Sequence, residues 1–304
     1  MNLETLPVLS LASDPAALSR DLGESFQTFG FAMVRDHGID PALIARAWEL
    51  TEAFFALPED VKRSYFLDGL AGARGYTPFG VEIAKGAKAR DLKEFWHVGR
   101  DLPADHPLAT TSMPPNIWPA RPEGFRETFE ALYAAFDQTG ARILARMAVW
   151  LGLDENWFDP AIADGNSVMR LLHYPPVPDA EGGAIRAGAH EDINLITLLL
   201  GAEEAGLELL SRDGEWLSVP APPGSLVINV GDMLQRQTGG ILPSTTHRVV
   251  NPAPERRHLS RYSMPFFLHY RPDWFIEPFV EREDMPAILA DDYLMQRLQE
   301  IKLT

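Results

Sequence analysis

After Gly165 the chain consists of short apolar segments separated by turn signals. Examples are "SVMRLLHYPP" at 167–176, "GSLVINVGDML" at 224–234 and "LSRYSMPFFLHY" at 259–270. The connecting stretches contain "DG" and "PPG", which end strands and reverse the chain. Many short strands of this kind are typical of an antiparallel sandwich or barrel, of which the jelly roll is one type. We therefore predict such a barrel for the C-terminal part.

The first half of the chain is dominated by helical patterns instead. Apolar residues recur at three-and-four spacing in residues 41–66 and 123–152. Asp14 followed by Pro15 predicts the start of an earlier helix, with the aspartate as N-cap. Between these helices, "FGFAMVRDHG" at 29–38 predicts a short strand that closes on a turn.

We divide the chain into two regions on this basis. Residues 1–120 form an N-terminal region of helices and short strands, and residues 121–304 form a barrel domain with a leading long helix. The predicted class is α+β, mainly β, with the helical N-terminal portion packed on the barrel. We find no internal repeat and no low-complexity linker, so we expect the two regions to pack together.

Composition excludes several classes of function. The chain has no cysteine, which excludes thiolate metal sites, iron–sulfur clusters and cysteine nucleophiles, so a metal must be bound through nitrogen and oxygen. The net charge of -16 opposes binding to nucleic acid and to anionic membranes. No apolar run approaches the ~20 residues that cross a bilayer, and the N-terminus does not resemble a signal peptide. We expect a cytoplasmic enzyme with a small-molecule substrate, as a monomer or weak homo-oligomer.

The stretch "AHEDINLITLL" at 189–199 places charged groups directly before an apolar run, where they are costly to bury unless something binds them. We predict a strand here, on which side chains alternate between two faces. His190 and Asp192 then point the same way, together with Asn194, and Glu191 points the other way. The pair could bind a metal, in which case a third ligand comes from elsewhere.

His247 is the best candidate among the other histidines, because it begins the β-branched strand in "STTHRVVNP" and could return beside the first strand. Two imidazoles and one carboxylate with open positions are typical of non-haem Fe(II) oxygenases. A buried hydrogen bond between His190 and Asp192 is the alternative. We expect His37 to make a structural hydrogen bond and His106 to lie in a polar loop.

A second group of polar residues lies in "LSRYSMPFF", where Arg261 and Ser263 share one face of a predicted strand. The planar guanidinium matches a carboxylate, and the hydroxyl adds a donor. The alternative is an arginine paired with an acidic side chain at the barrel rim. Phe267 lies on the same face and could line a pocket, whereas Phe266 would pack outward; both could equally be core residues.

Along nearly its whole length the chain resembles the isopenicillin N synthase-like branch of the iron- and 2-oxoglutarate-dependent oxygenases. The matching motifs are "FGFAMVRDHGI", "FFALPEDVKRSYF", "RGYTPFG" and "DLKEFWHVGR" in the first half, and "LLHYPP", "AHEDINLITLL", "THRVVNP" and "RYSMPFF" in the second. The resemblance implies a double-stranded β-helix, or jelly-roll, barrel with an iron at its mouth.

The resemblance also implies roles for particular residues. The iron-binding triad falls on His190, Asp192 and His247. The residues that bind 2-oxoglutarate fall on Arg261, Ser263 and Tyr174. The tyrosine motif reads "LHYPP" here, so Leu172 and His173 depart from the family's pattern.

The implied reaction is the oxidation, most commonly the hydroxylation, of a small molecule by O2, with 2-oxoglutarate converted to succinate and CO2. One alternative is an oxidase like isopenicillin N synthase, which uses O2 without 2-oxoglutarate. A lesser alternative is a metal hydrolase or a barrel that binds a ligand without turnover. The primary substrate is not predicted, because its contacts would come from the N-terminal helices, the loop at 78–99 and the segment after Trp274.

Overall fold

A computed structural model describes residues 6–67, 73–81, 92–176, 186–200, 206–220 and 222–300 of the protein. The strands of the two main sheets are β1 (Val8–Ser10), β2 (Phe31–Arg35), β3 (Gly75–Thr77), β4 (Glu94–Gly99), β5 (Val168–Tyr174), β6 (Ala187–His190), β7 (Ile196–Leu200), β8 (Leu207–Leu210), β9 (Trp216–Ser218), β10 (Leu226–Val230), β11 (His247–Val249) and β12 (Arg261–Leu268). Two further strands, β13 (Phe275–Ile276) and β14 (Ile288–Leu289), pair with each other. The helices are α1 (Pro15–Phe29), α2 (Pro41–Phe55), α3 (Glu59–Arg63), α4 (Phe125–Trp150), α5 (Asp159–Ile162), α6 (Asp232–Gln237) and α7 (Ala290–Glu300).

The strands form a larger sheet and a smaller one that face each other. The larger sheet has eight strands in the order β1-β2-β10-β7-β12-β5-β4-β3, and the smaller one has four in the order β6-β11-β8-β9. Every pair in these two sheets is antiparallel except β1 with β2. Apolar side chains from both sheets, such as Leu172 and Leu209, meet in one buried cluster between them. The predicted jelly-roll barrel is confirmed.

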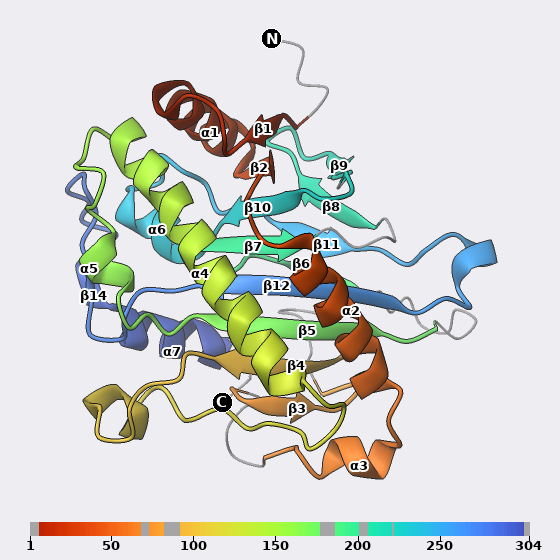
Figure 1. The fold of residues 1–304 in the computed structure, drawn as a ribbon. Helices are drawn as coiled ribbons and strands as arrows, with labels where there is room; N and C mark the ends of the chain where they lie inside the picture. The colour runs from red at the N-terminus through yellow and green to blue at the C-terminus, as the bar shows by residue number, and fades with distance from the viewer. Residues whose placement is uncertain are drawn as a thin grey trace.

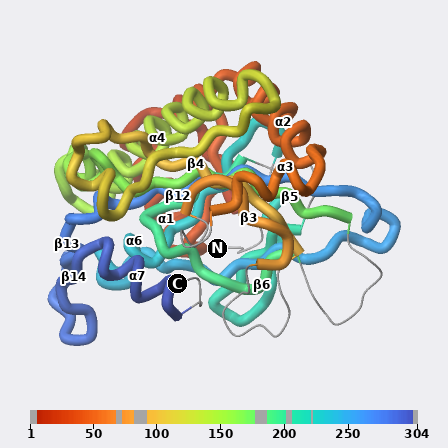
Figure 2. Tube along the Cα trace, turned by 90° about the horizontal axis from the view of Figure 1, so that it is seen from below, coloured from red at the N-terminus to blue at the C-terminus, as the bar shows by residue number. Residues whose placement is uncertain are grey.

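The outer face of the larger sheet is covered by helices. Figure 1 shows α4 running across this sheet, and Figure 2 shows α2 and α4 on one side of it and β6 on the other. Phe266 of β12 points to this side, where its ring stacks on Phe136 of α4 at 5.4 Å and meets the edge of Tyr133 at 5.0 Å. Gly140 allows close approach of α4, because a Cβ there would lie 2.3 Å from Leu268.

The N-terminal region contributes strands as well as helices. Asp14 caps α1 by accepting hydrogen bonds from the backbone N–H groups of Ala16 and Ala17, as its position before a proline predicts. The predicted strand at 29–38 is β2, which pairs with β10 inside the larger sheet. At the far edge of the same sheet, β4 pairs with β5. The N-terminal region therefore extends the barrel sheet on two sides.

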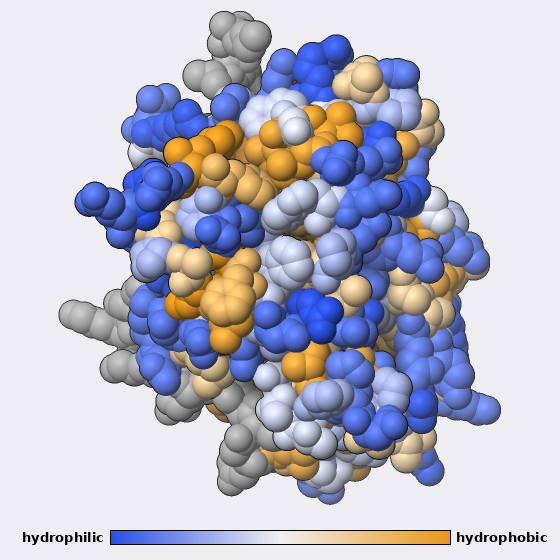
Figure 3. Space-filling model, turned by 90° about the vertical axis from the view of Figure 1, so that its left-hand side faces the viewer, coloured by the Kyte–Doolittle hydropathy of each residue, from blue (hydrophilic) through white to orange (hydrophobic). Residues whose placement is uncertain are grey.

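In the described part of the chain, no helix is both long and apolar enough to span a membrane. Hydrophilic side chains cover most of the face shown in Figure 3, and the apolar ones form separate patches.

Candidate metal centre and co-substrate anchor

The smaller sheet brings His190 and His247 together. β6 ends at His190, β11 begins at His247, and the two residues are direct partners in the antiparallel ladder. Their ring centroids lie 4.4 Å apart, and their Nε2 atoms lie 3.8 and 3.9 Å from Oδ1 of Asp192. Because imidazole nitrogens and carboxylate oxygens bind zinc, for example, at roughly 2.0–2.2 Å, these separations leave room for one ion. The three predicted ligands therefore converge.

The prediction of one strand over 189–199 is wrong, because the structure has two strands there. β6 ends at His190, residues 191–195 belong to no strand and bend at 193–195, and β7 begins at Ile196. The reason is that β6 belongs to the smaller sheet and β7 to the larger one, so the chain must turn a corner between them. Asp192 reaches the histidines from this corner. Glu191 points away, as predicted, and accepts a hydrogen bond from Thr246.

Asp192 is held by side chains of the larger sheet. Its Oδ2 accepts hydrogen bonds from Thr197 Oγ1 at 2.5 Å and from Asn229 Nδ2 at 2.9 Å. Asn194, expected on the face of His190, donates instead to Thr197 Oγ1 at 2.9 Å. With Oδ2 engaged, Oδ1 is the oxygen that faces the two imidazoles. Such outer partners fix the orientation of metal ligands.

The histidines are oriented in the same manner by the backbone. Nδ1 of His190 lies 2.7 Å from the carbonyl oxygen of Gly188, and Nδ1 of His247 lies 3.1 Å from that of Thr245. A carbonyl only accepts, so each Nδ1 carries the hydrogen and each Nε2 of a neutral ring presents a lone pair. This donor set fits a divalent metal.

The protonation states of His190 and Asp192 also fit metal binding. Desolvation inside the barrel, followed by the effect of neighbouring His247, lowers the pKa of His190 to about 4, so its ring is neutral at physiological pH. Burial alone would raise the pKa of Asp192, but His247, His190 and the hydrogen bonds to the carboxylate hold it below its usual value. In the described ranges, this is the one group of at least three His, Asp or Glu side chains placed to share a metal.

The predicted anchor residues lie on the inner face of the larger sheet. Arg261 begins β12, Tyr174 ends β5, and the two are direct partners in the ladder. The guanidinium lies 5.2 Å from the centre of the Tyr174 ring. Ser263 pairs with Leu172 two residues further along, and all four residues are buried. The structure thus places Arg261, Ser263 and Tyr174 side by side.

Sequence reasoning missed an arginine in the same barrel wall. Arg170 of β5 donates from Nε to Nε2 of His97 on β4 at 2.5 Å. Its guanidinium lies over the Phe95 ring at 4.2 Å and near the Phe267 ring at 5.5 Å. Phe267 therefore points inward, as proposed for a pocket-lining residue. Tyr174 was predicted from the family resemblance, but period-two alternation along the same strand places Arg170, four residues earlier, on the face of Tyr174 and could have identified it.

The remaining histidines are separated by their surroundings. His37 accepts a hydrogen bond from the backbone of Ile39, which is the structural role predicted for it. His106, predicted to lie in a polar loop, accepts a hydrogen bond from the backbone of Leu108. His269 continues the inward-facing series of β12, and burial lowers its pKa to about 4. Among the described residues, its Nδ1 has no hydrogen-bond partner. Much of the loop expected to contact substrate, residues 82–91, lies outside the described part.

Two family models match the chain. Residues 6–121 match the N-terminal region of non-haem dioxygenases, described from morphine synthesis, and residues 165–270 match the 2OG-Fe(II) oxygenase superfamily. Among curated proteins, the chain is 34% identical over 267 residues to a 2-oxoglutarate-Fe(II) type oxidoreductase of Emericella nidulans, covering 85% of this chain and 75% of the relative.

Solved structures show the same similarity. A protein of Caulobacter crescentus assigned to the 2OG-Fe(II) oxygenase family is 49% identical, with a TM-score of 0.89 over 98% of this chain and 99% of that one. A full-length protein of Neurospora crassa, crystallised in complex with alpha-KG (2-oxoglutarate), is 28% identical, with a TM-score of 0.87 over 98% and 97% of the two chains.

Proposed function

This chain belongs to the 2OG-Fe(II) oxygenase superfamily and is a dioxygenase that uses Fe(II), 2-oxoglutarate and O2, and from this premise we propose that His190, Asp192 and His247 hold its iron. One observation carries the proposal. The Nδ1 atoms of both histidines are hydrogen-bonded to backbone carbonyls. Both Nε2 atoms therefore present lone pairs to the space between them and Oδ1 of Asp192. Two imidazoles and a carboxylate with open positions are typical of non-haem Fe(II) oxygenases.

The protein's residues would bind and orient the reactants. When bound, the iron supplies the redox chemistry that couples cleavage of 2-oxoglutarate into succinate and CO2 to oxidation of a substrate C–H bond. Thr197 and Asn229 hold the carboxylate of Asp192 in place, and this side chain is only 7% exposed. Orientation and a dry pocket direct the oxidation to one bond of the substrate.

We assign the far carboxylate of 2-oxoglutarate to Arg261 and Ser263, with Tyr174 as a further donor. A buried guanidinium beside a hydroxyl matches a carboxylate through parallel charge-assisted hydrogen bonds. The oxidase alternative would place the substrate's own carboxylate there. The names of the relatives, which include 2-oxoglutarate oxidoreductases and a complex with alpha-KG, favour 2-oxoglutarate over that alternative and over a hydrolase.

The reaction that we propose is hydroxylation of a small molecule. Phe267, Arg170 and His269 lie along the inner wall and would contact it, the last through its Nδ1. Solved relatives bind different small molecules, since the Neurospora crassa protein was crystallised with alpha-KG and thymine, and JOX2 with 2OG, Fe and JA. The same iron chemistry also serves desaturation and ring closure in the family.

We also propose that the protein acts in the cytoplasm as a monomer or weak homo-oligomer. Its charge of -16 supports a function away from nucleic acid and anionic membranes. Residues 1–120 would serve to support the barrel domain of residues 121–304 and to close its substrate side.

The test is a turnover assay with Fe(II), 2-oxoglutarate and O2 and a panel of amino acids, peptides and small acids. We expect slow formation of succinate without a primary substrate and faster formation with it, together with a product heavier by one oxygen atom. Oxidation of a substrate without consumption of 2-oxoglutarate would overturn the proposal in favour of the oxidase.

A further inference from the structure

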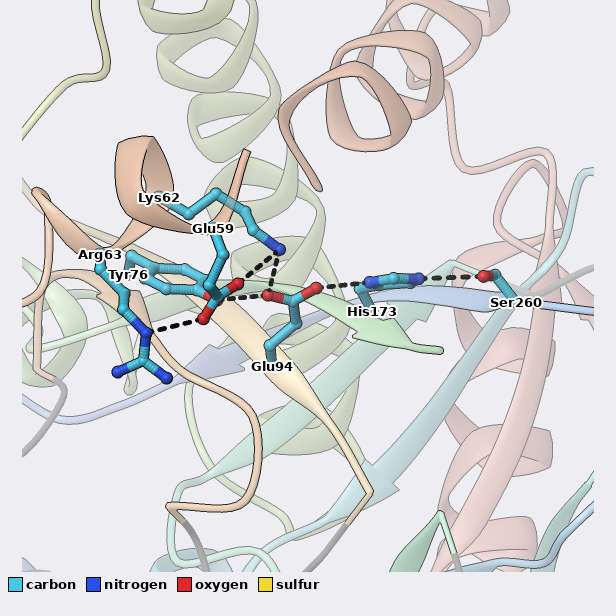
Figure 4. A network of polar contacts seen from close by, with 7 residues as sticks. All are labelled: Glu59, Lys62, Arg63, Tyr76, Glu94, His173 and Ser260. Atoms are coloured by element: carbon cyan, nitrogen blue, oxygen red, sulfur yellow. Dashed lines mark hydrogen bonds and ion pairs between the residues drawn. The ribbon is translucent and has the colours of Figure 1, made fainter. Parts of the chain in front are cut away.

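A buried carboxylate on the outer face of the larger sheet collects three hydrogen bonds (Figure 4). Oε2 of Glu94, the first residue of β4, accepts from Lys62 Nζ at 2.7 Å and from the Tyr76 hydroxyl. Oε1 accepts from Nδ1 of His173 at 2.7 Å. The side chains of Glu94 and Lys62 are 6% and 8% exposed. This carboxylate thus links Lys62 and Tyr76 of the N-terminal region to His173 of β5.

Burying such a network costs more desolvation free energy than burying apolar side chains. A buried ion pair is often no more stable than apolar side chains of the same volume, because both charges lose their water. Burial alone would raise the pKa of Glu94, but the bonds from His173, Lys62 and Tyr76 keep it below its usual value, so the group is a carboxylate. A carboxylate with three directed donors fixes positions more strictly than apolar packing does.

The network continues through His173 to the start of β12. Because the carboxylate of Glu94 only accepts, Nδ1 of His173 carries a hydrogen, and the other ring nitrogen, Nε2, makes a hydrogen bond with the hydroxyl of Ser260 at 3.0 Å. The His173 ring also stacks on Tyr262, with centroids 4.7 Å apart and planes inclined by 12°. His173 and Tyr262 are direct partners in the ladder of β5 and β12.

These contacts lie directly behind the co-substrate anchor. His173 precedes Tyr174, and Ser260 precedes Arg261. Tyr174 is the last residue of β5 and Arg261 the first of β12, so the anchor sits at the last rung of the ladder. Strand ends open more readily than strand centres. A connection between Glu94, His173 and Ser260 holds this rung closed from the outer face.

We propose that the chain Glu94–His173–Ser260 positions Tyr174 and Arg261 for the far carboxylate of 2-oxoglutarate. His173 is a positioning residue in this account, acting through its two neighbours on the inner face. The inference rests on the proposed function of that inner face. In this proposal the N-terminal region helps to position the anchor, since Lys62 and Tyr76 orient the carboxylate of Glu94.

The test compares two ligands on the Fe(II) protein under anaerobic conditions. 2-Oxoglutarate has both the metal-chelating 2-oxo acid group and the far carboxylate, whereas pyruvate has the first alone. Affinities are measured from the visible absorption of the iron complex of each ligand. His173→Phe keeps a ring against Tyr262 but loses both hydrogen bonds. We expect this variant to bind 2-oxoglutarate about tenfold more weakly, the size of effect that loss of a supporting hydrogen-bond partner has at metal sites. Its affinity for pyruvate should be unchanged.

Two further variants complete the test. Ser260→Ala removes the hydrogen bond to His173 at a partly exposed residue. It should weaken the binding of 2-oxoglutarate by about threefold, within the range that one hydrogen bond contributes. Arg63→Gln is the matched control, because Arg63 lies at the exposed end of the same network, with its Nε 2.8 Å from Oε1 of Glu59. This variant should change the affinity for neither ligand. The iron affinity and the thermal unfolding midpoint are measured for each variant.

The outcomes separate the two proposals. Unchanged 2-oxoglutarate affinity in both His173→Phe and Ser260→Ala, with the unaltered protein binding normally, would overturn the positioning role alone. Equal weakening of 2-oxoglutarate and pyruvate would also overturn it, because a general distortion affects both. If His173→Phe fails to fold, Ser260→Ala decides. Failure of the unaltered protein to bind 2-oxoglutarate would overturn the proposed function and this inference with it.

Discussion

Thr197 donates a hydrogen bond from Oγ1 to Oδ2 of Asp192 at 2.5 Å, across the corner where the chain passes from the smaller sheet to the larger one. The bond turns the other carboxylate oxygen toward His190 and His247. It therefore connects the position of the candidate iron ligand to the core of the barrel, and it suggests the first prediction.

Thr197→Val should lower Fe(II) affinity by about 10- to 100-fold, because it removes the hydroxyl that orients Asp192 without changing the shape of the side chain. Titration of the metal-free protein with Fe(II) under anaerobic conditions measures this. Thr51→Val is the matched control: Thr51 is also buried and donates to the Ala47 carbonyl of α2, away from the site. Equal iron affinity in the two variants would contradict the role of Thr197.

His247→Ala should abolish turnover and sharply weaken Fe(II) binding while the fold is retained, since the imidazole supplies a ligand and little of the core. Glu191→Ala and His106→Ala are controls, because Glu191 points away from the centre and His106 caps a distant turn. Both should keep the metal. Full activity in His247→Ala would refute the assignment of the triad.

Arg261→Ala should reduce the affinity for 2-oxoglutarate by about one to two orders of magnitude, as expected for loss of a charged hydrogen bond of about 1.5–3 kcal/mol. Iron binding should persist. Tyr174→Phe should give a smaller loss of the same kind. The apparent KM for 2-oxoglutarate measures both, and an unchanged value in Arg261→Ala would show that the anchor lies elsewhere.

Phe266→Ala should destabilise the fold by about 3–5 kcal/mol, because its ring is fully buried against α4. Phe267→Ala should cost clearly less, since that ring faces the barrel interior and is only partly buried. Urea unfolding gives both free energies. The reverse order would contradict the assignment of the two faces of β12.

The stability contributed by Glu94 should depend on pH. Its pKa is lowered in the folded state, so its contribution is complete above the unfolded value of about 4.3 and is lost as the pH falls through the folded value. The difference in unfolding free energy between the unaltered protein and Glu94→Gln should therefore shrink as the pH is lowered from about 6 to about 3. A difference that grows on acidification would contradict this.

Patterns that depend on neighbouring residues were predictable from the sequence. The alternation in "RYSMPFF" placed Arg261 and Ser263 on one face, and the start of a β-branched strand identified His247. The break after His190 was not predictable, because it arises from the transfer of the chain between two sheets, and the local pattern of 189–199 continues through it.

Contacts between residues far apart in the sequence could not be predicted either. Asn229 supports Asp192 from 37 residues away, and Glu94 meets His173 from 79 residues away. Neither pair has a local spacing that could reveal it. The departure of His173 from the family's motif was visible in the sequence, but its partners are defined only by the register of β4, β5 and β12.

The central claim is that one Fe(II) ion, bound by His190, Asp192 and His247, takes 2-oxoglutarate as a chelating co-substrate. Its most direct test is the visible spectrum of the protein mixed anaerobically with Fe(II) and 2-oxoglutarate. We predict a weak metal-to-ligand charge-transfer band, pink to lilac, that is absent with Zn(II) and lost in Asp192→Ala. Absence of this band at saturating 2-oxoglutarate, or its persistence in Asp192→Ala, would contradict the account.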